Sequence, residues 1–458
     1  MEKNYLARSI DVALLEWKES PLRKPLLVRG ARQVGKSSSV RHLGETFKYF
    51  LEVNLERNPE VVEIFKGNRD VKDIVRKLHD YYDVPIVPGE TLLFLDEIQR
   101  SEDVIRSLWF FKEDYRELHV VAAGSLLEFA LKDLPSFGVG RVSSLFVYPM
   151  SFDEFLLATG QQGLWRAKQD SNSGHPLLKA FYEKLVEAFR SFMLVGGMPE
   201  AVAAYAQTGS YRASSDIVNE ILQGYEDDFA KYSAKANPVL LRQTLVSVAH
   251  QVGAKFVYSR VEGQYRSAEV KTALEMLRDA GLIIPAYHTD ANGIPLGAEI
   301  NERVVKYLVH DSGILLALLG IDDDTESLIK ELMVENVVDL VDKGNVAEMI
   351  AGLEIMKCYS PQKRHQLYYW QNMNKGTCAE VDYIIAQGSW IVPIEVKSGV
   401  KGSMSSMYSL MKNPQKHIGR GVRCSLENFG SFLSPDGKTI DIIPLFAISS
   451  LFPCSRQE

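Results

Sequence analysis

The feature that most constrains the fold of this chain is the run Gly30-Ala-Arg-Gln-Val-Gly-Lys-Ser37, which follows a short apolar segment at residues 26–29. A Gly-x-x-x-x-Gly-Lys-Ser pattern between a strand and a helix indicates a loop whose main-chain N–H groups surround phosphates. We expect Lys36 to reach the β- and γ-phosphates of ATP and the Ser37 hydroxyl to bind Mg²⁺. The candidate nucleotide-binding residues are Gly30, Ala31, Arg32, Gln33, Val34, Gly35, Lys36, Ser37 and Ser38.

Two adjacent acidic residues, Asp96 and Glu97, follow the apolar run at residues 92–95, about 60 residues after the phosphate-binding pattern. Asp96 ends an expected strand, where its carboxylate can hold the hydration shell of Mg²⁺ as a metal-binding residue. Glu97 can polarise the attacking water as a general base. Together with Lys36, these two residues predict a site that binds and hydrolyses ATP.

Apolar runs recur at residues 26–29, 49–53, 91–95 and 119–123, and stretches with helical character separate them. Strands that alternate with helices predict an α/β fold, in which a parallel sheet carries helices on both faces. Continuous apolar runs suit central strands, because both faces of such strands are buried. We assign residues 1–150 to this first domain.

Further short motifs extend along nearly the whole chain. They are Tyr5-Leu-Ala-Arg8, Arg32-Gln-Val-Gly-Lys36, Leu95-Asp-Glu-Ile-Gln99, Gly140-Arg141, Tyr148-Pro-Met-Ser-Phe-Asp-Glu-Phe155, Gly196-Gly-Met-Pro199, Glu380-Val-Asp382 and Glu395-Val-Lys-Ser-Gly399. With these motifs the sequence resembles the prokaryotic AAA-type (AAA+) P-loop ATPases that carry a C-terminal domain of unknown function. The resemblance implies an AAA+ core, a winged-helix-like middle and a C-terminal fold like that of the PD-(D/E)xK nucleases. Ser37 departs from the Thr that is more usual in the family, but both residues carry the hydroxyl.

The resemblance also implies catalytic roles for two polar residues near the end of the first domain. Ser125 follows the apolar run at 119–123, where AAA+ proteins often carry a residue called sensor 1 that helps to position the lytic water. The alternative role for Ser125 is to cap the following helix. Arg141 can reach a γ-phosphate in cis or across a subunit contact, as arginine fingers do, or it can be an ordinary surface arginine.

The pattern changes after Pro149. Residues 151–235 are predicted to form a helical lid region, with a polar loop at residues 161–176 and a Gly-rich break at residues 194–199. The first of these stretches is polar, and the second is rich in Gly.

A winged-helix-like domain is predicted over residues 236–330. A helix at 267–281 precedes an apolar strand and a turn at 290–293, which together favour a helix followed by a hairpin. Basic residues on this segment can meet DNA, but acidic residues share its helix, so DNA contact and protein packing both stay open. The basic residues are Arg266, Lys271 and Arg278, and the acidic residues are Glu269, Glu275 and Asp279.

A short pattern of acidic and basic residues lies near the C-terminal end, on two expected strands joined by a Gly-Ser turn. Asp382 lies on the first strand, and Glu395 and Lys397 lie on one face of the second because side chains alternate. Two carboxylates beside a lysine can hold Mg²⁺, activate water and stabilise charge on a phosphate. An upstream helical glutamate usually completes such a site. Glu348 is the best match, with Glu354 as an alternative that faces elsewhere on the helix.

This arrangement resembles the PD-(D/E)xK nuclease core, and we assign residues 331–458 to an α/β restriction-endonuclease-like domain. The expected metal ligands are Asp382 and Glu395, and Glu348 and Lys397 complete the candidate catalytic set. Two alternatives stay open. One is a surface Glu–Lys pair on an edge strand, and the other is a fold that binds DNA without cutting it.

The charge of the whole chain does not identify a nucleic-acid binder, because the net charge is −7 and the pI about 5.8. A local patch can still differ from the total. From Lys397 to Cys424 the sequence contains basic residues but no Asp or Glu, which suits a nucleic-acid backbone. The basic residues are Lys397, Lys401, Lys412, Lys416, Arg420 and Arg423.

From the cysteines, the N-terminal residues and the apolar runs we expect a cytoplasmic protein. Cys358, Cys378, Cys424 and Cys454 form no CxxC pair, so we expect reduced thiols and no zinc site. The N-terminal residues do not read as a signal peptide, and no run of about 18 apolar residues occurs that would span a membrane.

Two functions of different kinds remain. We expect an ATPase whose nucleotide cycle controls a nuclease-like, nucleic-acid-directed domain. The alternative is an ATP-dependent regulatory switch whose C-terminal domain binds DNA or another partner without catalysis. A protein remodeller ranks last, because the first domain shows no aromatic residue flanked by Gly that would indicate a pore loop. ATP and Mg²⁺ are the expected cofactors, and DNA and further copies of this chain are the candidate partners.

Overall fold

The computed structural model describes residues 5–124, 127–133, 140–231, 236–320, 343–372, 379–397, 399 and 402–452. The chain divides into two compact units. The first unit contains Met1–Pro149, Asp279–Gly281 and Ser360–Arg364. The second contains Met150–Arg278, Leu282–Tyr359 and His365–Glu458.

The first unit is built on a parallel sheet, in which each neighbouring pair of strands runs in the same direction. Strands β3 and β4 are buried along their full length, as expected of central strands covered on both faces. The parallel α/β sheet predicted from the apolar runs is therefore confirmed. The strand order is β2 (Tyr49–Asn54), β3 (Thr91–Asp96), β4 (His119–Ala123), β1 (Leu26–Arg29) and β5 (Ser143–Phe146).

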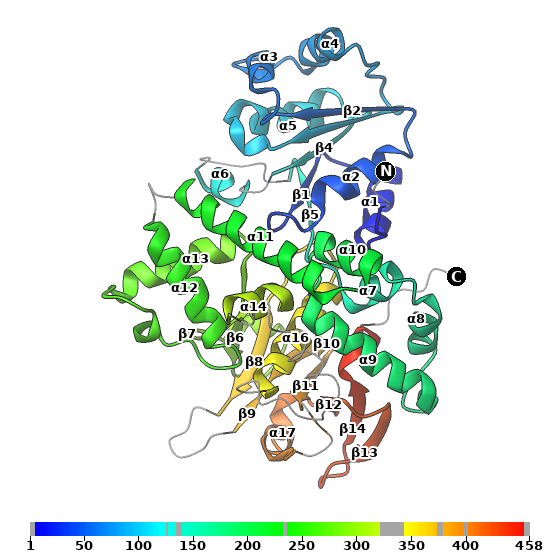
Figure 1. Cartoon of the computed structure of the whole chain (residues 1–458), viewed down its shortest axis with the longest axis vertical. Helices are drawn as coiled ribbons and strands as arrows, with labels where there is room; N and C mark the ends of the chain where they lie inside the picture. Colours follow the sequence, from blue (N-terminus) through cyan, green and yellow to red (C-terminus); the bar gives the residue numbers. More distant parts are fainter. Residues whose placement is uncertain are drawn as a thin grey trace. The chain divides into compact units, whose positions relative to one another are not determined.

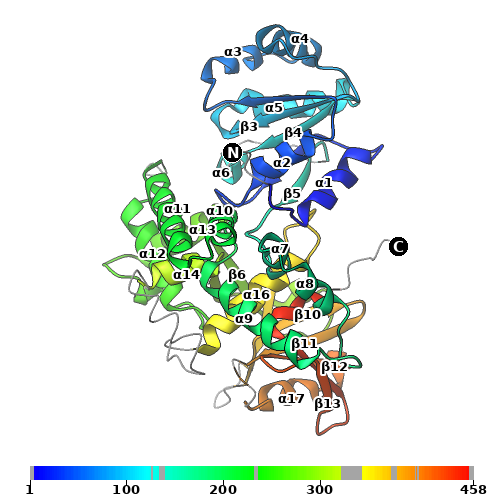
Figure 2. The same ribbon diagram turned by 45° about the vertical axis from the view of Figure 1, so that its right-hand side comes forward.

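Helices connect these strands, and side-chain caps define where several of them begin. The Asp70 carboxylate accepts hydrogen bonds from main-chain N–H groups in the first turn of α4, and Ser101 caps α5 in the same way. Helices α3, α4 and α5 pack together (Figures 1 and 2). The helices are α1 (Ile10–Glu19), α2 (Lys36–Gly44), η1 (Pro59–Val61), α3 (Val62–Phe65), α4 (Val71–Tyr82), η2 (Ile98–Arg100), α5 (Glu102–Asp114) and α6 (Leu127–Asp133).

The N-terminal part of the second unit is helical, as predicted for the region after Pro149. Helices α9, α11 and α14 contact one another, and α10 packs on α11. The helices are α7 (Phe152–Ala158), α8 (Gln162–Gln169), α9 (Lys179–Val195), α10 (Pro199–Thr208), α11 (Tyr211–Lys231), α12 (Pro238–His250), η3 (Tyr258–Arg260), α13 (Ser267–Asp279) and α14 (Ser312–Leu318).

The prediction of a loop at 161–176 was wrong over half of that stretch, because α8 occupies residues 162–169. The Lys168 ammonium lies 2.6 Å from the Asp153 carboxylate, and the Lys168 side chain is buried. This ion pair to a residue of α7 stabilises a helix that is polar over most of its residues. The break predicted at 194–199 is confirmed: α9 ends at Val195, Gly196 has a φ of +77°, and α10 begins at Pro199.

A four-stranded sheet follows in the order β7 (Ile300–Val309), β6 (Ile283–Thr289), β8 (Leu367–Gln371) and β9 (Glu380–Val381). Strands β6 and β7 are antiparallel, which confirms the predicted hairpin. β6 also pairs in parallel with β8, so one sheet contains strands from both sides of the predicted boundary at residue 330. The winged-helix-like domain and that boundary stay predictions.

A second sheet of mixed direction completes the unit, in the order β10 (Tyr383–Gln387), β11 (Trp390–Val396), β12 (Arg420–Ser425), β14 (Thr439–Pro444) and β13 (Gly430–Leu433). β10 and β11 form the predicted hairpin with its Gly-Ser turn. The placement of Asp382 on the first of these strands was wrong, because Asp382 lies at a bend between β9 and β10. The other elements are η4 (Leu296–Glu299), α16 (Lys343–Cys358), α17 (Ser405–Met411), η5 (Pro414–Lys416) and η6 (Leu445–Leu451).

Two helices that are far apart in the sequence pack against these two sheets. α16 contacts β7 and β11, and α17 contacts β9 and β11 (Figure 1). Met407 and Met411 of α17 pack in one buried cluster with Ile384 and Ile391 of the β10–β11 hairpin. α16 therefore presents residues to both sheets of the unit. Within the described residues, no helix is both long enough and apolar enough to cross a membrane.

Candidate nucleotide site and acidic cluster

The predicted phosphate-binding loop joins β1 to α2, and its backbone requires glycine. Gly30 has a φ of +146°, and a Cβ atom there would lie 2.2 Å from the main-chain oxygen of Val147. Gly35 has a φ of +94° and precedes the first residue of α2. The free N–H groups at the start of α2 therefore face the loop, which is the arrangement that binds anions.

Lys36 lies inside this loop. Its ammonium donates hydrogen bonds to the main-chain oxygens of Gly30, at 3.0 Å, and Ala31, at 2.7 Å. Burial lowers the pKa of Lys36 to about 8, although the charges of Glu97 and Asp96 act in the opposite direction. The buried ammonium is thus held inside the loop by two main-chain oxygens.

Ser37 and Asp96 meet as the sequence predicts for an Mg²⁺ site. The Ser37 Oγ donates to the Asp96 carboxylate, at 3.1 Å from Oδ2 and 3.3 Å from Oδ1. Burial raises the pKa of Asp96 to about 6, with Glu97 adding to the rise and the Ser37 hydrogen bond opposing it. A hydroxyl beside a carboxylate offers hard oxygen ligands, so these residues fit Mg²⁺.

Asn54 is a neighbour of this pair that the sequence interpretation did not single out. It ends β2 in register with Asp96 on β3, and its amide Nδ2 donates to Asp96 Oδ2 at 3.2 Å. The Asn54 Oδ1 accepts from the N–H groups of Glu56 and Arg57. The sequence could have indicated Asn54, because the carboxyl ends of adjacent parallel strands lie side by side.

Glu97 directly follows β3 in a left-handed conformation, with a φ of +56°. A non-glycine residue in this region is held there at a cost of about 1–3 kcal/mol, and such residues cluster at functional sites. The side-chain amide of Gln99 donates to the Glu97 carboxylate. The motif Asp96-Glu-Ile-Gln99 therefore folds back on itself and fixes the orientation of the expected general base.

Two further residues, Ser125 and Arg141, were predicted for this site. Ser125 lies outside the described residues. The Arg141 guanidinium lies 3.0 Å from the Glu113 carboxylate and over the ring of Trp109, so it packs on α5. A role for Arg141 at a γ-phosphate would require it to leave that ion pair, and the role stays a prediction.

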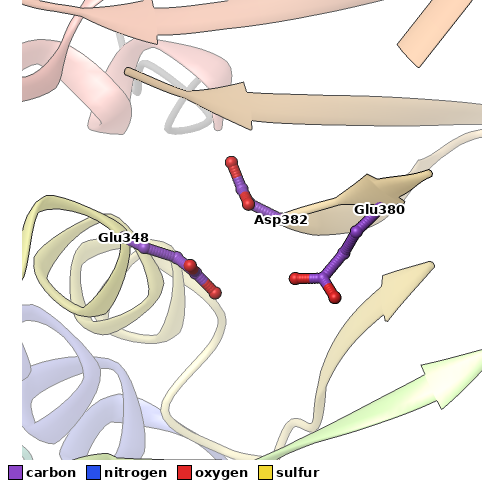
Figure 3. Close-up of side chains that lie close together, drawn as sticks. All are labelled: Glu348, Glu380 and Asp382. Carbon is purple, nitrogen blue, oxygen red and sulfur yellow. The ribbon is translucent and has the colours of Figure 1, made fainter. Parts of the chain in front are cut away.

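A second constellation lies in the second unit, where one carboxylate oxygen from each of Glu348, Glu380 and Asp382 lies within 4.8 Å of the others. Figure 3 shows Glu348 pointing from its helix, α16, toward the two residues of the β9 segment. Carboxylate oxygens at this spacing are the ligands that Mg²⁺ and Mn²⁺ prefer. The predicted residues Glu348 and Asp382 are thus brought together, and Glu380 joins them.

Lys306 is, besides Glu380, a residue of this cluster that the sequence interpretation missed. It lies on β7, its ammonium is 2.8 Å from Glu348 Oε1, and it also donates to Glu380 Oε1. Burial alone would lower the pKa of Lys306, but the charges of Glu348, Glu380 and Asp382 raise it above its usual value. A lysine within the apolar run of residues 304–309 was the available signal, because a buried lysine needs a carboxylate partner.

Glu395 and Lys397 lie beside the cluster at the end of β11. The Lys397 ammonium is 2.6 Å from Glu395 Oε1, and Asp382 Oδ2 accepts a hydrogen bond from the N–H of Val396 at 2.7 Å. Burial, followed by the charge of Asp382, raises the pKa of Glu395 to about 7. The four predicted residues Glu348, Asp382, Glu395 and Lys397 therefore occupy one region of the second unit.

Glu354, the alternative to Glu348, forms its hydrogen bonds and its ion pair with residues outside the cluster. Its carboxylate accepts from the N–H of Phe152, the first residue of α7, at 3.1 Å and lies 3.0 Å from the Lys357 ammonium. The Lys357 ammonium also donates to the main-chain oxygen of Met150. Glu354 thus fixes the start of α7 on α16, and Glu348 is the α16 glutamate that reaches the cluster.

Several basic residues of the predicted 397–424 stretch are engaged within the protein. Lys416 donates to the Asp290 carbonyl, Arg420 pairs with Asp441, and Arg423 lies 2.8 Å from Glu427. Lys401 lies outside the described residues. This stretch offers fewer free cations than its sequence suggests, and nucleic-acid binding by it stays a prediction.

Three regions of the chain match models of known protein families. Residues 22–156 match the family model described as AAA domain. These residues form an AAA-type domain. The AAA-type domain is P-loop ATPase-like, with the parallel sheet and loop described above. Residues 186–325 and 343–447 match two families described as domains of unknown function, DUF8612 and DUF4143.

Two solved structures show similarity to the chain. One is the Walker-type ATPase PABY2304 of Pyrococcus abyssi, with 17% identity, a TM-score of 0.43, and coverage of 69% of this chain and 97% of that chain. The other is the Aeropyrum pernix Orc1 protein in complex with DNA, with 12% identity, a TM-score of 0.29, and coverage of 71% and 96%. No curated protein matched the chain.

Proposed function

We propose that this protein binds ATP with Mg²⁺ and hydrolyses it, and that the nucleotide cycle controls a nuclease-like, nucleic-acid-directed site in the second unit. The observation that carries the ATPase part is the contact between Ser37 and Asp96, with Oγ 3.1 Å from Oδ2 at the mouth of the phosphate-binding loop. These two residues would hold Mg²⁺, which would neutralise charge on the β- and γ-phosphates. The AAA-type match over residues 22–156 supports the same assignment.

The residues of the chain divide the work of hydrolysis. Lys36 lies where it can bind the β- and γ-phosphates, and the N–H groups at the start of α2 orient them. Glu97 accepts a proton from the attacking water, and Gln99 holds the Glu97 carboxylate in place. The left-handed backbone at Glu97 fits this role, because such strained residues cluster at functional sites.

Nucleotide binding and hydrolysis are tested with separate variants. Lys36→Ala should lose tight ATP binding, measured by calorimetry, and Glu97→Gln should bind ATP but release little phosphate. Lys48→Ala is the matched control, because Lys48 is an exposed lysine paired with Glu90. Normal ATP affinity in Lys36→Ala would remove the assignment, and normal turnover in Glu97→Gln would show that another group activates the water.

The nuclease-like part rests on the cluster of carboxylates beside Lys397. Asp382 and Glu395 are the proposed metal ligands, Glu348 supplies a third carboxylate, and Lys397 would stabilise charge that develops on a phosphate. The donor set fits Mg²⁺ or Mn²⁺, because all the ligand atoms are carboxylate oxygens. We take phosphodiester cleavage in DNA as the reaction that such a site would perform.

Cleavage of plasmid and single-stranded DNA, with Mg²⁺ or Mn²⁺ and with or without ATP, tests this part. Cleavage that is lost in Lys397→Ala and retained in Lys412→Ala, an exposed lysine beyond α17, would support a nuclease. A change in cleavage between wild type and Lys36→Ala at saturating ATP would support control by nucleotide. Absence of cleavage in all conditions would remove the nuclease and leave the regulatory switch.

The switch is the second candidate function, and the engaged basic residues of the 397–424 stretch favour it. Arg420 and Arg423 are both paired with carboxylates, so fewer cations are offered to a nucleic-acid backbone. A switch predicts slow or absent hydrolysis and an oligomeric state that changes with ATP. Sedimentation velocity of the Glu97→Gln variant with and without ATP distinguishes the two functions.

A further inference from the structure

The acidic cluster of the second unit contains a cation of its own. The Lys306 side chain is 3% exposed, and its ammonium bridges Glu348, at 2.8 Å, and Glu380. The ring of Tyr369 lies 4.9 Å away from the ammonium and covers another side of it. The ammonium is therefore surrounded by groups that stabilise positive charge, and it is separated from solvent.

The segment that carries Lys306 is fixed in place. β7 pairs with β6 along most of its length, and Lys306 is in register with Ala286 in the middle of that pairing. The carboxylate partners come from two other elements, because Glu348 lies on α16 and Glu380 on β9. Lys306 thus links three elements through one charged group, and only its side chain can move without breaking the sheet.

A divalent cation cannot bridge the same two oxygens while Lys306 is present. Mg²⁺ and Mn²⁺ bind carboxylate oxygens at about 2.1 Å, so an ion on Glu348 Oε1 and Glu380 Oε1 would lie within about 3 Å of the ammonium. Two positive groups at that distance, shielded from water, repel strongly. One cation therefore excludes the other from the position between Glu348 and Glu380.

A second observation indicates that the cluster is suited to another ligand. Glu395 Oε2 is buried and has no hydrogen-bond partner among the described residues, while Oε1 is paired with Lys397. The Glu395 side chain is 6% exposed, so bulk solvent has little access to it. A buried carboxylate oxygen without a partner is costly, and a metal ion beside Asp382 would satisfy it.

We propose that Lys306 is the resident cation of the acidic cluster, and that a divalent metal ion binds Glu348, Glu380 and Asp382 only when the Lys306 ammonium has moved out. This inference rests on the proposal that the cluster is the metal site of the second unit. It adds that the Lys306 ammonium blocks metal binding at that site. Metal binding at these three residues then requires a rotation of the Lys306 side chain.

Binding of Mn²⁺ alone, without nucleotide or DNA, tests the inference. Asp96→Asn is included in every protein so that the first unit offers no competing metal site. Lys306→Met removes the ammonium and keeps a side chain of similar length against Tyr369. We expect it to bind Mn²⁺ at least about 10-fold more tightly than the parent, measured by electron paramagnetic resonance of free Mn²⁺. Lys306→Arg keeps the charge and should show no gain.

The Glu380→Gln substitution shows where the ion binds. The gain in Lys306→Met should disappear when Glu380→Gln is added, and Mn²⁺ binding to the parent should not change with Glu380→Gln. The second comparison does not depend on Lys306→Met being folded. If the parent binds Mn²⁺ tightly and Glu380→Gln weakens that binding, metal and Lys306 coexist and the inference fails, while the metal site stands. If the gain in Lys306→Met survives Glu380→Gln, the inference fails and the proposed metal site on Asp382 and Glu395 stands. If no protein binds Mn²⁺, the inference and the proposed nuclease site both fail.

Discussion

The Arg8 guanidinium donates a hydrogen bond from Nη1 to the main-chain oxygen of Val34, 2.9 Å away, inside the phosphate-binding loop. Its Nη2 donates to the main-chain oxygen of Tyr148 at 2.7 Å. Arg8 itself is buried. A residue near the N-terminus therefore links the loop to the segment that follows β5.

Arg8→Met should weaken ATP binding. The change removes the donors to the main-chain oxygens of Val34 and Tyr148, at a cost of about 1–3 kcal/mol, and we expect about a 10-fold loss of ATP affinity in calorimetry. Arg23→Met is the control, because Arg23 also donates to a main-chain oxygen, that of Glu117, but at the surface. Equal ATP affinity in the two variants would show that the loop does not depend on Arg8.

Gln99→Met should lower the turnover of ATP and leave its affinity unchanged. Without the amide of Gln99 the Glu97 carboxylate is less well oriented, and a misoriented general base costs about 10-fold or more in kcat. Phosphate release and ATP binding are measured in parallel, with Arg100→Met, an exposed neighbour paired with Glu56, as the control. A parallel loss of kcat and ATP affinity would indicate a structural role for Gln99 instead.

Glu354→Ala should destabilise the second unit without affecting Mn²⁺ binding. It removes a buried partner of Lys357 and of the Phe152 N–H, and loss of one member of a buried ion pair costs about 3 kcal/mol or more. Thermal unfolding measures the stability, with Glu183→Ala as an exposed control. A Lys306→Met protein that carries Glu354→Ala should retain its Mn²⁺ affinity, and a loss there would place Glu354 in the metal site.

His119 should make the first unit sensitive to acid. It lies between Trp17 and Phe47, and its Nε2 is 3.2 Å from the Lys18 carbonyl. Its Nδ1 is buried and has no hydrogen-bond partner within the part of the chain that the structure describes. Burial lowers the pKa of His119 to about 4, with the charge of Arg23 acting in the same direction. Protonation would place an unpaired N–H in an apolar site, so the folded unit favours the neutral ring.

The direction of the pH effect follows from that lowered pKa. The unfolded chain binds the proton near pH 6.5, so the stabilisation is complete above that pH and decreases as the pH falls toward 4. Between pH 7 and pH 5 we expect a loss of about 2 kcal/mol. Hydrogen exchange of residues 119–123 measures it. The loss should be absent in His119→Gln and present in His42→Gln, and an equal loss in both would contradict the assignment.

The sequence by itself determined most of the nucleotide site. The run from Gly30 to Ser37 is continuous, so its loop geometry follows from local requirements for glycine and from the helix that starts at Lys36. Asp96 is distant in sequence but lies at the carboxyl end of an apolar strand, and parallel strands bring such ends to one edge of the sheet. Asn54 was overlooked although the same rule applies to it.

Tertiary structure decided the composition of the acidic cluster. Glu348, Asp382, Glu395 and Lys397 follow a spacing that the resemblance could supply, but Lys306 belongs to a hairpin that was assigned to another domain. Its place depends on the pairing of β6 with β8, which is set by packing between segments about 80 residues apart. The role of a charged side chain likewise depends on tertiary structure. Burial and partners from distant elements determine whether the side chain faces solvent, binds a ligand or neutralises a neighbouring charge.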